Sequence, residues 1–195
     1  MRNIFYNCKS LKDLDLSNFN TKKFKNMAHM FDSCHSLTSL NISNFDTSSV
    51  TDFSFMFNEL HNIKNLDINR FETRNSLTLR NMFEGNYQLN NLEISAFDTS
   101  KVTDMRMMFY KCINLKSINV SKFITNKVKD MDLMFNNCSS LTFLDLTSFN
   151  ISECKNLIGI VDDIPDLTVL MKNNSDVKNL IDEINNAYSN IIFDN

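Results

Sequence analysis

Residues 89–109 read Leu-Asn-Asn-Leu-Glu-Ile-Ser-Ala-Phe-Asp-Thr-Ser-Lys-Val-Thr-Asp-Met-Arg-Met-Met-Phe, and most of the chain before residue 162 repeats this stretch every 26 residues. One phenylalanine recurs at that step, at Phe19, Phe45, Phe71, Phe97, Phe123 and Phe149. A second, preceded by methionine in five of its six copies, recurs at Phe5, Phe31, Phe57, Phe83, Phe109 and Phe135. A fixed period of this size is typical of stacked repeat architectures, so the repeat decides the fold prediction.

Each unit divides into two halves with different apolar spacing. The first half reads Leu-x-x-Leu-x-Leu/Ile/Val-x-x-Phe, and this alternation predicts a short strand with one buried face. In the second half Val102, Met105, Met108 and Phe109 stand at i, i+3, i+6 and i+7, which predicts a short helix with Phe and Met as stacked core ladders. Residues placed to cap such a helix are Thr47, Thr73 and Thr99, with Ser48 and Ser100 as competitors.

These halves predict an α/β repeat fold, a right-handed leucine-rich-repeat solenoid with a parallel strand ladder and short helices over residues 1–161. The first unit is incomplete, because Met1 aligns with the middle of a repeat, and we expect a truncated product or a piece of a longer array. Residues 162–174 are predicted to be a degenerate repeat or linker. Residues 175–195 are predicted to be a C-terminal capping helix, with a partner-binding helix as the alternative.

Composition excludes several classes of function. The 195 residues carry a net charge of −3, which argues against a nucleic-acid binder that relies on phosphate neutralisation. No apolar run approaches the roughly 18 residues that span a bilayer, so no direct membrane insertion is expected. The N-terminal residues lack the apolar core of a signal peptide.

Cysteines and histidines are the candidates for chemistry. Cys8, Cys34, Cys112 and Cys138 share one repeat position, where we expect buried packing. Equivalent residues of neighbouring units would lie about 5 Å apart, so the disulfides Cys8–Cys34 and Cys112–Cys138 remain an alternative. The three histidines show no established ligand spacing and are expected to be solvated or capping. They are His29, His35 and His61.

No enzyme is predicted, and neither a metal nor another cofactor. The chain has two glycines, Gly85 and Gly159, which leaves no glycine-rich phosphate loop and no nucleophile elbow. Asp, Ser and His are present, but nothing in the sequence places them in a triad.

A polar row accompanies the predicted strands. Its six members stand between two apolar positions, so strand alternation places them on the face opposite the core. They are Asp15, Asn41, Asp67, Glu93, Asn119 and Asp145. Four of the six are carboxylates, which favours a basic protein partner or weak calcium binding. A solvated sheet face that is polar for solubility is the alternative.

Residues 11–161 resemble the BspA-like leucine-rich-repeat surface proteins, in the variant with 25–26-residue units. Residues 37–57 follow the pattern Leu-x-x-Leu-Asn-Ile-Ser-x-Phe-Asp-Thr-Ser-x-Val-Thr-x-x-x-x-Met-Phe, and residues 115–138 add the closing cysteine. The resemblance implies a cell-surface or secreted location, although the chain shows no signal peptide or anchor. It also implies a non-enzymatic protein-interaction module, part of a bacterial-type adhesin that binds host or extracellular proteins. The alternatives are an intracellular scaffold or a structural repeat that self-associates edge to edge.

Overall fold

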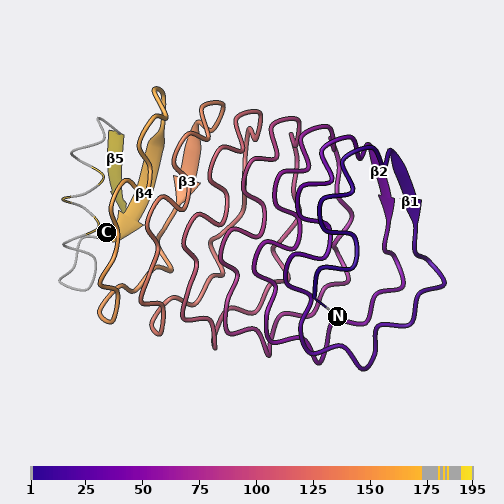
Figure 1. The fold of residues 1–195 in the computed structure, drawn as a ribbon. Helices are drawn as coiled ribbons and strands as arrows, with labels where there is room; N and C mark the ends of the chain where they lie inside the picture. The colour runs from indigo at the N-terminus through magenta and orange to yellow at the C-terminus, as the bar shows by residue number, and fades with distance from the viewer. Residues whose placement is uncertain (1, 173–179, 181, 183, 185–189, 195) are drawn as a thin grey trace.

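The computed structural model describes residues 2–172, 180, 182, 184 and 190–194. Its named strands are β1 (Asp13–Asp15), β2 (Ser39–Asn41), β3 (Phe143–Asp145), β4 (Thr168–Lys172) and β5 (Asn190–Asp194). All pairings are parallel, in one sheet of order β1-β2 and another of order β3-β4-β5. Between the two sheets the chain runs as a stack of similar coils from one end of the molecule to the other (Figure 1).

The predicted fold class is wrong, because residues 2–172 contain no helix. In the second half of each unit, alternate backbone N–H groups leave their own coil and bind the next one. Met105 N–H donates to Asp130 C=O at 2.9 Å, and Phe109 N–H donates to Met134 C=O at 2.9 Å. Met108 N–H instead closes a short turn on Met105 C=O at 3.2 Å. A helix needs these donors for bonds four residues back along the chain, so the segment forms turns instead.

The backbone is also left-handed at two positions in each unit, which further disfavours a helix. One series is 3, 29, 55, 81, 107, 133 and 159, and the other is 7, 33, 59, 85, 111, 137 and 163. A residue with positive φ interrupts a right-handed helix, and glycine adopts this conformation at least cost. Both glycines of the chain stand in these series, Gly85 at φ 68° and Gly159 at φ 62°. A Cβ on Gly159 would lie 2.9 Å from Leu133 Cδ2 of the preceding unit.

A second backbone ladder runs along the turns, and the sequence analysis missed it. Its members pair in parallel with the equivalent residue of the next unit, without interruption. They are Asn26, Asp52, Thr78, Asp104, Asp130 and Asn156. The strand side is less continuous, since only the single bridge Asn65↔Asn91 lies between the units of β2 and β3. The units are therefore joined most regularly along the turns.

Aromatic stacking fills the core, as the repeat predicts. Rings 26 residues apart lie face to face with centroids 5.4–5.8 Å apart. The stack consists of Phe5, Phe31, Phe57, Phe83, Phe109 and Phe135. Met108 and its equivalents are buried beside it. The predicted Phe and Met ladders are confirmed.

Buried threonines join neighbouring units at a third place. Thr99 Oγ1 donates to Ile124 C=O at 3.0 Å and accepts Ile124 N–H at 2.7 Å. Equivalent donor bonds to the residue 25 positions on are made by Thr21, Thr47, Thr73 and Thr125. The prediction that Thr47, Thr73 and Thr99 cap helices is therefore wrong, because their hydroxyls bind the next unit.

The predicted capping helix is described at few positions, and Leu180, Asp182 and Ile184 are helical there, with Leu180 and Ile184 buried. Most of residues 175–195 lie outside the described part of the chain. Asn190–Asp194 is strand β5, which pairs in parallel with β4, so the helical prediction fails for these residues. β4 itself lies in the predicted linker 162–174 and continues the sheet from β3. Within the described residues no helix has the length and hydropathy to cross a membrane.

Candidate functional site

The six residues of the predicted polar row lie on successive units, at the outer surface of the strand side. Asp15 and Asn41 are direct partners in the β1–β2 pairing. Five of the six side chains are exposed and Asp145 is half-buried. The structure therefore brings the row together as one line of polar groups.

Each member of this row also has a local structural role that the sequence analysis missed. Its side-chain oxygen accepts the backbone N–H two residues later, at 2.8–3.2 Å in all six units. The acceptance of the Ser17 N–H lowers the pKa of Asp15, and the hydrogen bonds from Ser95 lower the pKa of Glu93. Such bonds stabilise the turn that follows the strand. In the four members that are carboxylates, this bond occupies one oxygen and leaves the second outside it.

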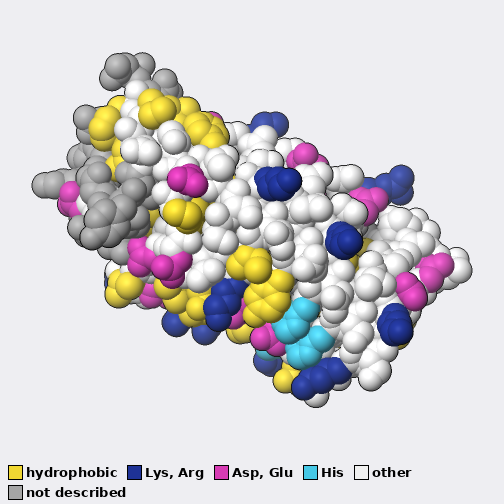
Figure 2. Space-filling model, turned by 90° about the horizontal axis from the view of Figure 1, so that it is seen from above, with side chains coloured by type: hydrophobic (Ala, Val, Ile, Leu, Met, Phe, Trp, Pro, Cys, Tyr) yellow, Lys and Arg dark blue, Asp and Glu magenta, His cyan; other side chains and the backbone are white. Residues whose placement is uncertain are grey.

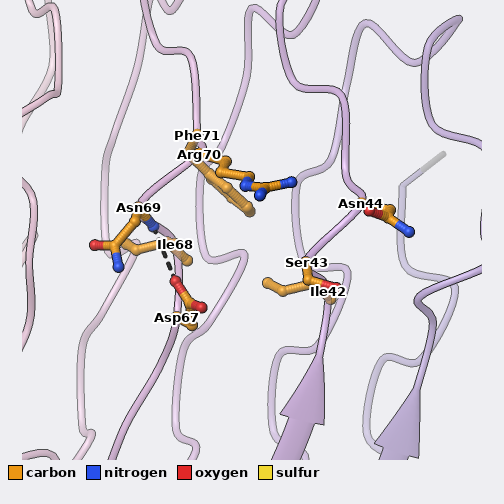
Figure 3. A pocket seen from close by; sticks show the side chains of 8 residues that line it. All are labelled: Ile42, Ser43, Asn44, Asp67, Ile68, Asn69, Arg70 and Phe71. Carbon is orange, nitrogen blue, oxygen red and sulfur yellow. Dashed lines mark hydrogen bonds between the residues drawn. The ribbon is translucent and has the colours of Figure 1, made fainter.

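A groove of two hollows opens on this face between the second and third units, and Asp67 lines both of them; Figure 3 shows the first. One hollow of about 380 Å³ is lined by Ile42, Ser43, Asn44, Asp67, Ile68, Asn69, Arg70 and Phe71. A second hollow of about 490 Å³ also includes Asp67, together with Ser39 of β2 and Lys64. Figure 3 shows Arg70 extending from its own unit toward Asn44 of the preceding one.

The strand ladder is open beside the groove. β2 pairs with β1, but no backbone hydrogen bond joins residues 38–42 to residues 64–68, all of which the structure describes. On the turn side the same two units remain joined through Asp52 and Thr78. The side chains around the opening supply apolar contact and hydrogen bonds. Asp67 takes part in none of the ion pairs found among the described residues.

The cysteines are free thiols in the structure, including the pairs Cys8–Cys34 and Cys112–Cys138. Cys138 Sγ donates to Phe109 C=O at 3.1 Å, and burial raises the pKa of this thiol to about 12. Asn86, at the equivalent position of another unit, donates to Phe57 C=O at 3.0 Å. Leu60 fills this position in a further unit, so the position accepts buried side chains of different chemistry, and the raised pKa of Cys138 makes its thiol a poor nucleophile.

The histidines lie together on another face, beside apolar and charged side chains (Figure 2). His29 Nδ1 lies 2.7 Å from Asp32, whose other oxygen accepts the Ser33 hydroxyl at 2.8 Å. Asp32 therefore separates Ser33 from His29, and this arrangement does not activate a nucleophile. In the described part of the chain, one group of three side chains offers ligand atoms within 4.8 Å of one another. The three side chains belong to His35, Glu59 and His61. No short metal-binding motif in the sequence points to them.

Comparison with known proteins identifies a family. The model of the family described as "Mycoplasma protein of unknown function, DUF285" matches residues 1–91 and again residues 61–172. No curated protein and no solved structure matches the chain.

Proposed function

The chain belongs to this DUF285 family, and we propose that it is a non-enzymatic protein-interaction module whose partner binds the strand face at the groove around Asp67. The observation that carries the proposal is the groove itself, a preformed opening between two stacked units. Because the units are joined by buried ladders on their other sides, binding orders little of the chain and loses little entropy.

Charge indicates the chemistry of the partner. The polar row contains four carboxylates and no cation, and Asp67 stands where the row crosses the groove. Ile42 and Phe71 also line the hollow, but both side chains are almost fully buried. A polypeptide segment that presents a lysine or arginine to Asp67 fits this arrangement.

Neutralisation of Asp67 tests the proposal. In Asp67→Asn the turn is retained, because Asn41 accepts the equivalent N–H at 3.2 Å. We expect this variant to bind lysine- and arginine-containing peptides, selected from an arrayed library, about 3–10-fold more weakly than the unchanged chain. Fluorescence anisotropy at fixed ionic strength measures the difference.

Glu153→Gln is the matched control, since Glu153 is an exposed carboxylate that belongs neither to the polar row nor to the groove around Asp67. It should bind the selected peptides as the unchanged chain does. An equal loss of peptide affinity in both variants would show that only the net charge matters. Unchanged affinity in Asp67→Asn would contradict binding at the groove.

The location is a further part of the proposal. A cell-surface or secreted adhesin follows from the resemblance of the repeats to BspA-like proteins, and an intracellular scaffold with the same binding face is the alternative. The groove serves either role, so its test does not depend on the compartment.

Self-association is the second candidate, and the N-terminal end of the stack favours it. Phe5, Leu11 and Phe19 are partly exposed there, whereas their equivalents in the next unit are buried. A second copy stacked on this end would cover the ends of these apolar ladders. Sedimentation over a concentration series distinguishes the two, because a chain that remains monomeric at high concentration excludes the stacked assembly.

A further inference from the structure

His35 and His61 occupy the same position in two successive units, 26 residues apart. Their rings lie parallel, with centroids 4.3 Å apart and an interplanar angle of 5°. Glu59 stands beside them, with its Oε2 3.2 Å from His35 Nε2. All three side chains are half-buried and reach the surface. Two imidazoles and a carboxylate thus converge from neighbouring coils.

His61 has an unsatisfied polar atom in this cluster. Its Nε2 is buried and has no hydrogen-bond partner. A buried polar atom without a partner is uncommon in folded proteins, and a bound cation would satisfy it.

Neighbouring residues position the carboxylate and the ring. Ser33 Oγ lies 3.3 Å from Glu59 Oε2. Gly85, the equivalent of Glu59 in the next unit, has no side chain, and a Cβ there would lie 3.3 Å from Glu59 Cγ. Tyr87 stacks on the other face of His61 with ring centroids 4.7 Å apart. Outer contacts of this kind orient metal ligands in established sites.

We propose that His35, Glu59 and His61 form a binding site for a divalent transition metal ion, with zinc as the preferred ion. Two imidazole nitrogens and one carboxylate oxygen are ligands that suit zinc and leave one position open, whereas calcium and magnesium prefer sets of oxygen ligands. The site is distinct from the groove around Asp67 and does not depend on the proposed function.

Metal binding requires a small rearrangement of the cluster. The ligand atoms lie within 4.8 Å of one another, and tetrahedral zinc brings its ligand atoms to about 3.3 Å. Parallel rings cannot both direct an in-plane lone pair at one ion, so at least one imidazole must tilt out of the stack. Bound metal should therefore shift the ring resonances of both His35 and His61.

Titration of the purified full chain with Zn²⁺ and with Co²⁺ tests the site. We expect one ion per chain by calorimetry, and a Co²⁺ spectrum of nitrogen and oxygen ligands without a thiolate band. His35→Ala and Glu59→Gln should each lower the affinity at least about tenfold, because losing even an outer partner of a metal ligand costs about that much. His29→Ala is the matched control and should leave the affinity within about twofold, because His29 contacts Asp32 outside the cluster.

The variant His61→Tyr distinguishes the loss of a metal ligand from misfolding. Tyrosine already occupies the equivalent position at Tyr87, where it stacks on the neighbouring ring, so the variant keeps the fold and removes a ligand. Loss of Zn²⁺ binding in a variant with unchanged thermal unfolding supports the site. Undiminished binding in His61→Tyr and His35→Ala, or no binding by the unchanged chain in a metal-free buffer, would overturn it.

Discussion

Phe109→Ala is expected to lower the free energy of unfolding by about 3–5 kcal/mol, the range for removal of a buried phenylalanine side chain. Phe109 has no exposed surface, and its ring stacks on Phe83 and Phe135 with centroids 5.7 and 5.4 Å away. Truncation removes one ring from the middle of the stack and leaves a cavity between three units. The protein should also unfold in two steps, because a stacked repeat is stabilised chiefly by contacts between neighbouring units.

Urea denaturation followed by circular dichroism measures both effects. Phe143→Ala is the control, because Phe143 lies in β3 with 47% of its surface exposed and should cost no more than about 1 kcal/mol. If the two alanine variants lost equal stability, the aromatic stack would not be the core that holds the units together.

Thr99→Val should lower the free energy of unfolding by about 1–3 kcal/mol, since it deprives main-chain groups of Ile124 of their partner. Valine has nearly the same shape as threonine and fills the same buried space. The Thr99 hydroxyl donates to Ile124 C=O at 3.0 Å and accepts Ile124 N–H at 2.7 Å, and valine does neither. The Ile124 amide should also exchange its hydrogen faster in this variant.

Thr99→Ser is the matched control for this change. It keeps the hydroxyl and loses one methyl group, so it should retain the protection of the Ile124 amide. The valine variant could instead match the unchanged chain in free energy of unfolding and in hydrogen exchange of the Ile124 amide. That result would show that the threonine ladder does not join the units.

The sequence alone predicts the 26-residue register and the buried ladders, because Phe31, Phe57 and Phe83 repeat at one position and must meet when units stack. It mispredicts the helices for a physical reason. Apolar residues at i, i+3, i+6 and i+7 also arise from successive three-residue turns, such as the one closed by Met108 N–H on Met105 C=O. Periodicity does not distinguish a helix from turns whose remaining donors bind the next unit.

Part of the candidate site follows from sequence and part does not. Strand alternation places Asp67 and its equivalents on the outer face, where the structure has them. The turn hydrogen bonds are signalled only by short polar residues two positions later, such as Ser17 after Asp15. The groove cannot be read from the repeat, because its hollows depend on the side chains of two particular units.

The cluster of His35, Glu59 and His61 could not be predicted from the sequence either. Its residues are far apart in the chain, and a search for short metal-binding motifs does not connect them. One full repeat separates the two histidines, so only the stacking of units reveals that they are neighbours.

Scalar coupling across the hydrogen bond of the Phe109 amide tests the fold most directly. We expect coupling between the Phe109 nitrogen and the carbonyl carbon of Met134, in the next unit, where the N···O distance is 2.9 Å. A helix would instead couple this amide to the carbonyl of Met105, four residues earlier. Coupling to Met105 would contradict the stack of turns. It would also contradict the groove and the proposed metal site, because both depend on how neighbouring units stack.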